Sequence, residues 1–246
     1  MGDSLFEIMD ILHEDGTCFL LITNGYLLTQ EKVKKLSKYR YHWIQVSIDG
    51  VTAKYHDTFR RREGCWERAV NGAYMISAAG IPLTIAHCVT PENLDQVDEM
   101  CDLAYSLGAS SIILGEMNLS GRVAENRELL LSREQKSLLL EKYEINLSKY
   151  QGKMLVQRSA TAKNSVMRYI GMPNSGMIIR PNGDIRLDCM TPFVIGNILK
   201  DDFSKIWNEK HDTCWNHPKV VEYISQFNEE DTNNLMTNYV DNDIYI

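Results

Sequence analysis

Short apolar runs alternate with longer amphipathic segments along the first 150 residues. Residues 18–22 form a continuous apolar run, which predicts a strand buried on both faces. Further strands are predicted over residues 43–48, 82–89 and 111–115, with residues 153–158 as one more candidate. Apolar positions at helical spacing predict intervening helices over residues 5–12, 32–38, 66–79, 94–107 and 132–149. Strands separated by helices of this length indicate βαβ units and a parallel sheet.

The pattern changes after Gly121. Two short alternating segments, residues 176–180 and 184–187, flank Pro181-Asn182-Gly183, and an Asn-Gly pair in this setting predicts a β-hairpin. Residues 203–207 open a short helix, and the tail from Glu229 is acidic and rich in asparagine. We therefore predict an α/β domain over residues 1–150 and a small α+β module with an acidic tail over residues 151–246.

The composition is that of an ordinary globular protein, with 44% hydrophobic and 24% charged residues in a chain of 246. The net charge of −7 argues against a nucleic-acid partner and an anionic membrane surface, both of which attract basic faces. No apolar run approaches the roughly 18 residues that span a bilayer, and the N-terminus lacks the basic start of a signal peptide. These features predict a cytoplasmic protein.

Cysteine spacing excludes the common local metal motifs. The chain has six cysteines, of which the nearest two, Cys88 and Cys101, are 13 positions apart. There is no Cys-x-x-Cys or Cys-x-x-His, so the usual zinc, redox and iron–sulfur spacings are absent. Free thiols are expected in such a chain. The six are Cys18, Cys65, Cys88, Cys101, Cys189 and Cys214.

Polar residues follow each predicted strand of the parallel sheet, where such sheets bind their ligands. They are Thr23, Asn24 and Gly25; Ser47, Asp49 and Gly50; Val89-Thr90 and Asn93; and Glu116 with Asn118. Hydroxyls, amides and a carboxylate on one rim suit a ribose or an amino-acid zwitterion, whereas the structural alternative is that they cap the following helices. The run Arg60-Arg61-Arg62 is either a solvated loop face or the source of one arginine that grips a bound carboxylate.

Taken in order, these motifs resemble the middle and second half of a radical S-adenosylmethionine (SAM) enzyme. The resemblance is carried by Thr23-Asn24-Gly25, Ser47-Ile48-Asp49-Gly50, His56-Asp57-x-Phe59-Arg60, Val89-Thr90-x-x-Asn93 and Leu119-Ser120-Gly121-Arg122. The hairpin around Asn182-Gly183, followed by Cys189, Ile195-Gly196-Asn197-Ile198 and Ile206-Trp207, resembles the SPASM module, or its shorter twitch form, of peptide-modifying members.

The resemblance implies strands three to six of a (β/α)6 barrel and a binding site for SAM. Thr23, Asn24 and Gly25 would end strand three, and Ser47 would face the ribose or amino-acid part of SAM, with Asp49 closing the turn behind it. Arg60 would pair with the SAM carboxylate, while Val89 and Asn93 would line the pocket. Cys189 would match one cluster ligand of the SPASM module. The implied cofactors are SAM and a [4Fe–4S] cluster, and the implied activity is modification of a ribosomally made precursor peptide through a 5′-deoxyadenosyl radical.

The sequence also departs from this family. It contains neither the Cys-x-x-x-Cys-x-x-Cys loop that holds the family's cluster nor the Gly-Gly-Glu segment that receives the SAM amino group. We therefore expect an N-terminally truncated chain that begins just after the Gly-Gly-Glu loop and is not competent alone. One alternative is a non-catalytic relic that binds a peptide or docks a partner, with the acidic tail gripping a basic leader. A metal-free aldolase-like lyase ranks last, because no predicted strand ends in a Schiff-base lysine.

Overall fold

The computed structural model describes residues 3–119, 121–160, 162–172, 176–189, 191–211, 213–226 and 243–246. It divides into two compact units, residues 1–116 with 131–159 and residues 117–130 with 160–246. The strand Leu155–Arg158 pairs with the sheet of the first unit and belongs to that unit. No helix in the described part of the chain combines the length and apolar character needed to cross a membrane.

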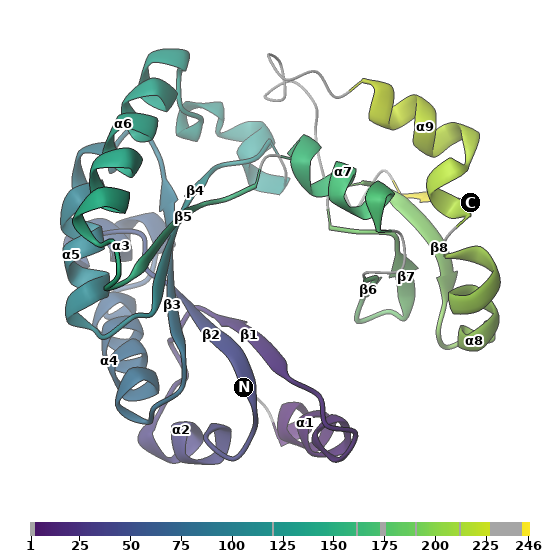
Figure 1. The fold of residues 1–246 in the computed structure, drawn as a ribbon, viewed down its shortest axis with the longest axis horizontal. Coiled ribbons are helices and arrows are strands. Elements are labelled where there is room, and N and C mark those ends of the chain that lie inside the picture. Colours follow the sequence, from purple (N-terminus) through teal and green to yellow (C-terminus); the bar gives the residue numbers. More distant parts are fainter. Residues whose placement is uncertain are drawn as a thin grey trace. The chain divides into compact units, whose positions relative to one another are not determined.

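The first unit is an α/β layer built on a five-stranded parallel sheet (Figure 1). Its strands follow one another in space as in sequence: β1 (Phe19–Thr23), β2 (Tyr41–Ser47), β3 (Leu83–Val89), β4 (Ser111–Glu116) and β5 (Leu155–Arg158). Its helices are α1 (Asp3–Glu14), α2 (Gln30–Leu36), α3 (Ala53–Arg60), α4 (Cys65–Ala78), α5 (Val97–Ser106) and α6 (Arg133–Lys149). The predicted βαβ alternation and parallel sheet are confirmed.

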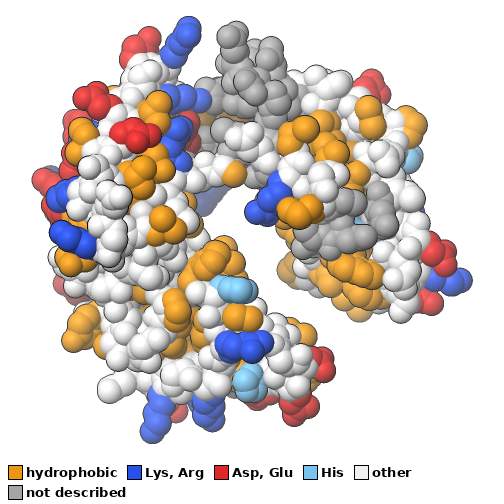
Figure 2. Space-filling model, viewed as in Figure 1, with side chains coloured by type: hydrophobic (Ala, Val, Ile, Leu, Met, Phe, Trp, Pro, Cys, Tyr) orange, Lys and Arg blue, Asp and Glu red, His pale blue; other side chains and the backbone are white. Residues whose placement is uncertain are grey.

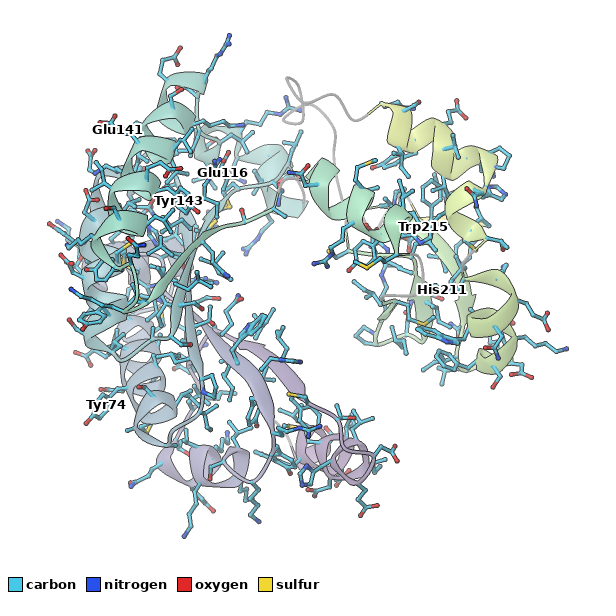
Figure 3. All side chains as sticks on the ribbon, viewed as in Figure 1. Tyr74, Glu116, Glu141, Tyr143, His211 and Trp215 are labelled. Atoms are coloured by element: carbon cyan, nitrogen blue, oxygen red, sulfur yellow. The ribbon has the colours of Figure 1, made fainter. Side chains whose placement is uncertain are left out.

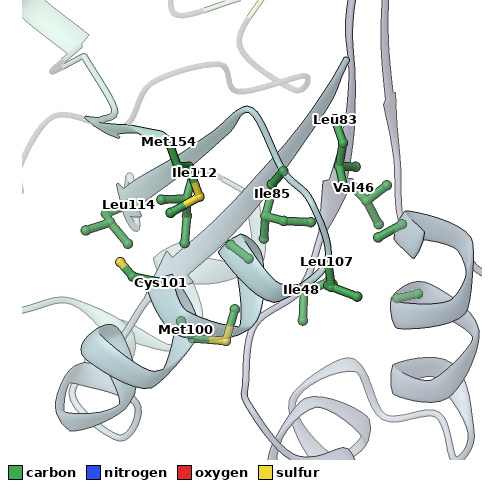
Figure 4. Packing of buried hydrophobic residues seen from close by; sticks show 14 of the residues in the cluster. Val46, Ile48, Leu83, Ile85, Met100, Cys101, Leu107, Ile112, Leu114 and Met154 are labelled. Atoms are coloured by element: carbon green, nitrogen blue, oxygen red, sulfur yellow. The ribbon is translucent and has the colours of Figure 1, made fainter. Parts of the chain in front are cut away.

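One face of this sheet packs against the helices and forms the core (Figure 4). Alternate residues of a strand point to opposite faces, so Ile44 and Val46 of β2 are fully buried with Ile85 of β3. The opposite face carries polar side chains in the middle of the sheet and apolar ones on β1. Gln45, Thr84 and Ser111 lie in register across three strands, where Thr84 and Ser111 share a hydroxyl hydrogen bond of 2.7 Å.

The first strand is buried on one face only, so the expectation of burial on both faces is wrong. Leu20 is 47% exposed and Ile22 is 61% exposed, whereas Phe19 and Leu21 pack against the core. β1 is one of the two edge strands of the sheet, and within the first unit Leu20 and Ile22 lie on its exposed face. Figure 2 shows hydrophobic side chains at the surface in this region.

The second unit is built on a small mixed sheet. β6 (Ile178–Ile179), β7 (Asp184–Arg186) and β8 (Phe193–Asn197) pair antiparallel, and β9 (Ile244–Tyr245) adds to β8 in parallel. The first two strands and their turn at residues 181–183 confirm the predicted hairpin. The helices of the unit are α7 (Ala162–Gly171), α8 (Phe203–Lys205), which continues into a π-helical turn over Ile206–Lys210, and α9 (Pro218–Ser225).

An apolar cluster holds the second unit together. Ile185, Phe193 and Ile195 from the sheet pack with Trp215 and Val220. The predicted acidic tail lies outside the described residues except for Asp243, which forms an ion pair with Arg180 just before β9. The end of the chain therefore contributes a strand and an ion pair to this unit.

Gly25 has a close packing requirement as well as a special backbone conformation. Its φ of +74° lies in the left-handed region, and a Cβ there would lie 2.8 Å from the Cα of Ala69 on α4. Gly16 has a similar φ of +76° but no atom within 4 Å of the corresponding Cβ position. A side chain at either glycine would strain the backbone, but only a side chain at Gly25 would also clash with a neighbouring atom.

We predict that Gly25→Ala lowers the free energy of unfolding by about 3 kcal/mol and that Gly16→Ala lowers it by about 1 kcal/mol. Both variants carry the left-handed strain, and only the first pushes a methyl group into the α4 backbone. Urea unfolding of both variants measures the difference. Equal losses would show that α4 moves away at no cost.

Candidate functional site

Parallel pairing brings the carboxyl ends of β1 to β4 to one edge of the first unit's sheet. The loops that leave this edge contain the residues predicted as a site from the sequence. Each strand contributes a different chemical group there. Some of these groups are already hydrogen-bonded or buried within the described part of the protein, and others are not.

The turn after β1 is organised by its own side chains. Thr23 Oγ1 accepts the Gly25 N–H at 3.1 Å, and Asn24 Oδ1 accepts the Tyr26 N–H at 3.1 Å. These short-range bonds are typical of polar turn residues and hold the chain while Gly25 packs on α4. The turn thus has a structural role, and its predicted contact with a ligand stays a prediction.

Ser47 ends β2 on the polar face of the sheet. It lies opposite Ala86 of β3 in the strand register and is partly exposed. Among the residues that the structure describes, none forms a hydrogen bond with Ser47 Oγ. A hydroxyl that remains available beside a small neighbour is suited to contact a bound polar molecule.

Asp49, two residues further on, joins three elements through buried hydrogen bonds. Its carboxylate is 1% exposed and accepts Arg60 Nε at 2.5 Å and, more weakly, the Cys88 N–H at 3.4 Å. Its N–H donates to His56 Nδ1 at 3.0 Å, and its carbonyl accepts Asn93 Nδ2 at 2.9 Å. The ends of β2 and β3 and the helix α3 are therefore held together at this residue.

His56 is a neutral acceptor in this network. Burial lowers the pKa of His56, and the charge of Arg60 also lowers it, while Asp49 and Asp57 oppose the shift. Because Nδ1 accepts the Asp49 N–H, the ring proton is assigned to Nε2. His56 and Arg60 are four residues apart and so lie on the same face of α3.

The three adjacent arginines separate into different environments. Arg60 ends α3 and turns to Asp49, whereas Arg61 adopts a left-handed conformation with a φ of +53° as the cap of the helix. Arg62 donates to the Tyr26 hydroxyl at 2.7 Å and lies over its ring. Of the two alternatives considered for this segment, the solvated loop face and the arginine that grips a ligand carboxylate, Arg62 resembles neither, whereas Arg60 ends α3 and points back to the strand ends.

Val89 and Asn93 are both fully buried, so neither side chain offers surface to a ligand. Val89 packs in the core between sheet and helices. Asn93 donates to the carbonyls of Asp49 and Cys88, each at 2.9 Å, and accepts the Thr90 N–H at 2.7 Å. Asn93 therefore stabilises the loops at this edge of the sheet through buried hydrogen bonds.

Glu116 at the end of β4 is engaged in ion pairs (Figure 3). Its carboxylate lies 3.5 Å from Lys136 Nζ and 3.4 Å from Arg158 Nη2. Asn118 is exposed in the following loop. Of the two, Glu116 serves to join β4 to β5 and α6.

The cluster His56, Asp57 and Cys65 has donor atoms within 4.8 Å of one another, as a metal site would. Its ligand atoms already form hydrogen bonds within the fold, since Asp57 accepts the N–H groups of Gly64 and Trp66 as well as the Cys65 thiol, and His56 Nδ1 accepts the Asp49 N–H. Burial raises the pKa of Asp57 but these bonds outweigh it, so the pKa is lowered. Burial and the bond to Asp57 raise the pKa of Cys65 to about 11. We assign the cluster to the capping of α4.

The cysteines of the first unit do not form a ligand set for an iron–sulfur cluster. Cys65, Cys88 and Cys101 lie on α4, β3 and α5, and Cys18 precedes β1. Burial raises the pKa of Cys88 and of Cys101 to about 12, which disfavours the thiolate that binds iron. Among the described residues no three cysteines gather within ligand distance.

The second unit does not fit a four-cysteine cluster either. Residues 160–246 contain only Cys189 and Cys214, whereas a [4Fe–4S] cluster takes four ligands. Cys189 is exposed, and Cys214 is buried in the apolar cluster beside Trp215, which stacks on Tyr169 at 5.8 Å. Figure 3 shows Trp215 and His211 in this unit. The predicted role of Cys189 as a ligand stays a prediction.

His87 is a core histidine of β3 and not a rim ligand. Its Nδ1 lies 3.2 Å from the Ile48 carbonyl and donates to it, and its Nε2 is buried with no hydrogen-bond partner among the described residues. Burial lowers the pKa of His87 to about 4, although the nearby charge of Asp49 opposes the shift. The ring is therefore neutral near pH 7.

Two family models match the chain in the regions of these two units. The model of the radical SAM superfamily matches residues 1–104, and that of the SPASM iron–sulfur cluster-binding domain matches residues 171–233. An AdoMet-dependent heme synthase of Methanosarcina barkeri is 35% identical over 51% of this chain and 36% of its own length. A PqqA peptide cyclase of Rhizobium meliloti is 28% identical over 84% of this chain and 57% of its own length.

Solved structures agree on the fold. Streptococcus suis SuiB bound to its precursor peptide SuiA superposes with a TM-score of 0.62 and 13% identity, over 84% of this chain and 51% of that one. This likeness extends to the α/β layer and the small hairpin unit and concerns the fold. Residues 1–104 are therefore similar to the radical SAM superfamily and residues 171–233 to the SPASM iron–sulfur cluster-binding domain, and SAM and iron–sulfur clusters are the cofactors of these families. It spans roughly one third to three fifths of the length of the curated relatives described above.

We predict that acid destabilises the chain partly through His87. The unfolded histidine takes up a proton below pH 6.5 and the folded one only near pH 4, so the free energy of unfolding falls across this window by up to about 3 kcal/mol. His87→Asn keeps a donor for the Ile48 carbonyl and should remove this part of the slope. Urea unfolding between pH 7 and 4 measures it, with the exposed His42→Asn as control. An unchanged slope in His87→Asn would contradict the prediction.

Proposed function

We propose that this chain binds SAM and belongs to an enzyme that modifies a ribosomally made precursor peptide in the cytoplasm. The relatives named PqqA peptide cyclase and the structure of SuiB with its precursor peptide support a peptide substrate. The six free thiols support a reducing compartment.

The proposal is carried by two groups at the same edge of the sheet: the Ser47 hydroxyl, which is not hydrogen-bonded to any described residue, and the Arg60 guanidinium, which is fixed by Asp49. Ser47 Oγ has no hydrogen bond among the described residues, and Arg60 is anchored through Nε only. A guanidinium suits a carboxylate and a hydroxyl suits a ribose or an ammonium group, so the donor set fits the amino-acid end of SAM. The backbone of the Thr23–Gly25 turn borders the same edge.

In this family, SAM acts with a reduced [4Fe–4S] cluster to abstract a hydrogen atom from the substrate. The chain's own cysteines do not supply the ligands, so we propose that catalysis requires cluster ligands from outside these 246 residues. Within the chain, Arg60 and Ser47 bind and orient SAM, while Asn93 and Asp49 hold the loops that carry them. The same lack of ligands favours a second candidate, a non-catalytic protein that retains peptide binding.

We predict that the chain binds S-adenosylhomocysteine, which has the amino-acid end and nucleoside of SAM and is chemically stable. Arg60→Ala should weaken this binding roughly 10- to 100-fold, because it removes a charge-assisted contact with the carboxylate. Arg62→Ala is the matched control, since Arg62 is bound to Tyr26 and should change the affinity less than about twofold. Isothermal titration calorimetry measures all three proteins.

The outcomes separate the candidates. Wild-type chain that binds no S-adenosylhomocysteine would contradict the proposed SAM site, and affinity for a precursor peptide in its absence would favour the non-catalytic protein. Equal effects of Arg60→Ala and Arg62→Ala would show that the arginines act only through general charge.

A further inference from the structure

Asp49 holds the helix α3 at two points one turn apart. Its N–H binds His56 Nδ1 at 3.0 Å, and its carboxylate binds Arg60 Nε at 2.5 Å. Asp49 is itself fixed to β3 and to the loop that follows it, because its carboxylate accepts the Cys88 N–H and its carbonyl accepts Asn93 Nδ2. The position of Arg60 relative to the strand ends is thus determined by one buried residue.

The mode of this contact determines which edge of Arg60 remains available. A guanidinium is planar and has five N–H donors, so a bond at Nε leaves the pair of terminal nitrogens free to bind a second anion. Among the residues the structure describes, none accepts a hydrogen bond from Arg60 Nη1 or Nη2. The Arg60 side chain is 37% exposed, whereas Asp49 is 1% exposed. The terminal nitrogens of Arg60 therefore belong to the more exposed partner of the Arg60–Asp49 ion pair.

The Asp49 carboxylate is buried and binds Arg60 and the Cys88 N–H, so the predicted role of Asp49 in SAM binding would act through Arg60. The buried negative charge instead offsets part of the charge on Arg60 and restricts its rotation. A ligand carboxylate would then bind the terminal N–H groups of an Arg60 side chain whose orientation is fixed, and not those of a freely rotating side chain.

We propose that Asp49 is a positioning residue, which aims the terminal nitrogens of Arg60 at the carboxylate on the amino-acid end of the ligand. This inference rests on the proposed SAM site. It assigns to Asp49 an effect that reaches the ligand only through Arg60.

Two nucleosides distinguish this role from a general structural one. S-adenosylhomocysteine has the amino-acid end, and 5′-methylthioadenosine has the same nucleoside and thioether without it. We expect Asp49→Asn to weaken binding of S-adenosylhomocysteine about tenfold and to leave 5′-methylthioadenosine within about twofold. Thr52→Ala is the control, because it removes the N-terminal cap of α3 without touching the ion pair and should lower the affinity for both nucleosides alike or for neither.

Loss of both affinities in Asp49→Asn, or of neither, would overturn the inference, as would the same selective loss in Thr52→Ala. Wild-type chain that binds neither nucleoside would instead contradict the proposed SAM site. If the wild-type chain binds 5′-methylthioadenosine and S-adenosylhomocysteine with equal affinity, Arg60 does not bind the carboxylate. The inference would then fail, although the chain would still bind the nucleoside.

A measurement on the wild-type chain covers the case in which Asp49→Asn does not fold. Arginine side-chain NMR, with Arg60→Lys to assign the signal, should show an Arg60 Nε–H that exchanges slowly with solvent. Addition of S-adenosylhomocysteine should keep this signal and slow the rotation of the terminal nitrogens, and addition of 5′-methylthioadenosine should not affect them. A rapidly exchanging Nε–H, or terminal nitrogens that respond to both nucleosides, would overturn the inference.

Discussion

Five parallel strands bury one face beneath helices, and the candidate site depends on this arrangement. Because every strand runs in the same direction, the loops after β1 to β4 leave from the same edge. The buried face takes branched apolar residues such as Ile44 and Ile85, and the other face carries small and polar residues such as Ser47 and Ala86 at the ends of β2 and β3. The polar face and the loop edge together provide the setting for Ser47 and Arg60.

Within that frame, a buried carboxylate does the local positioning. An ionised group in the interior is costly unless it is paired and hydrogen-bonded, and Asp49 satisfies this with Arg60 and the N–H of Cys88. In return, the helix α3 is held to the strand ends at a defined position. Arg62, two residues beyond Arg60, contacts the Tyr26 ring instead, so the three arginines have separate functions despite their common chemistry.

The second unit is similar to an iron–sulfur cluster-binding domain but contains two cysteines, Cys189 and Cys214. The SPASM model matches residues 171–233, yet the core there is an apolar cluster in which Cys214 packs beside Trp215. Arg186 is buried with it and donates to the Thr191 carbonyl. Hydrophobic contacts and a buried polar group stabilise the hairpin unit without requiring four cysteines.

The sequence by itself determined the elements with strong local patterns. The apolar runs and the Asn182-Gly183 turn located the parallel strands and the hairpin, because these patterns depend on neighbours a few residues apart. Ordered motifs such as Thr23-Asn24-Gly25 also located the family correctly.

The tertiary structure alone decided which rim residues are accessible and how they are paired. Asn93 meets Asp49 across 44 positions and Arg60 meets it across 11, and β1 is an edge strand only because of its place in the sheet. Such pairings follow from the packing of distant elements, to which periodicity along the chain is insensitive.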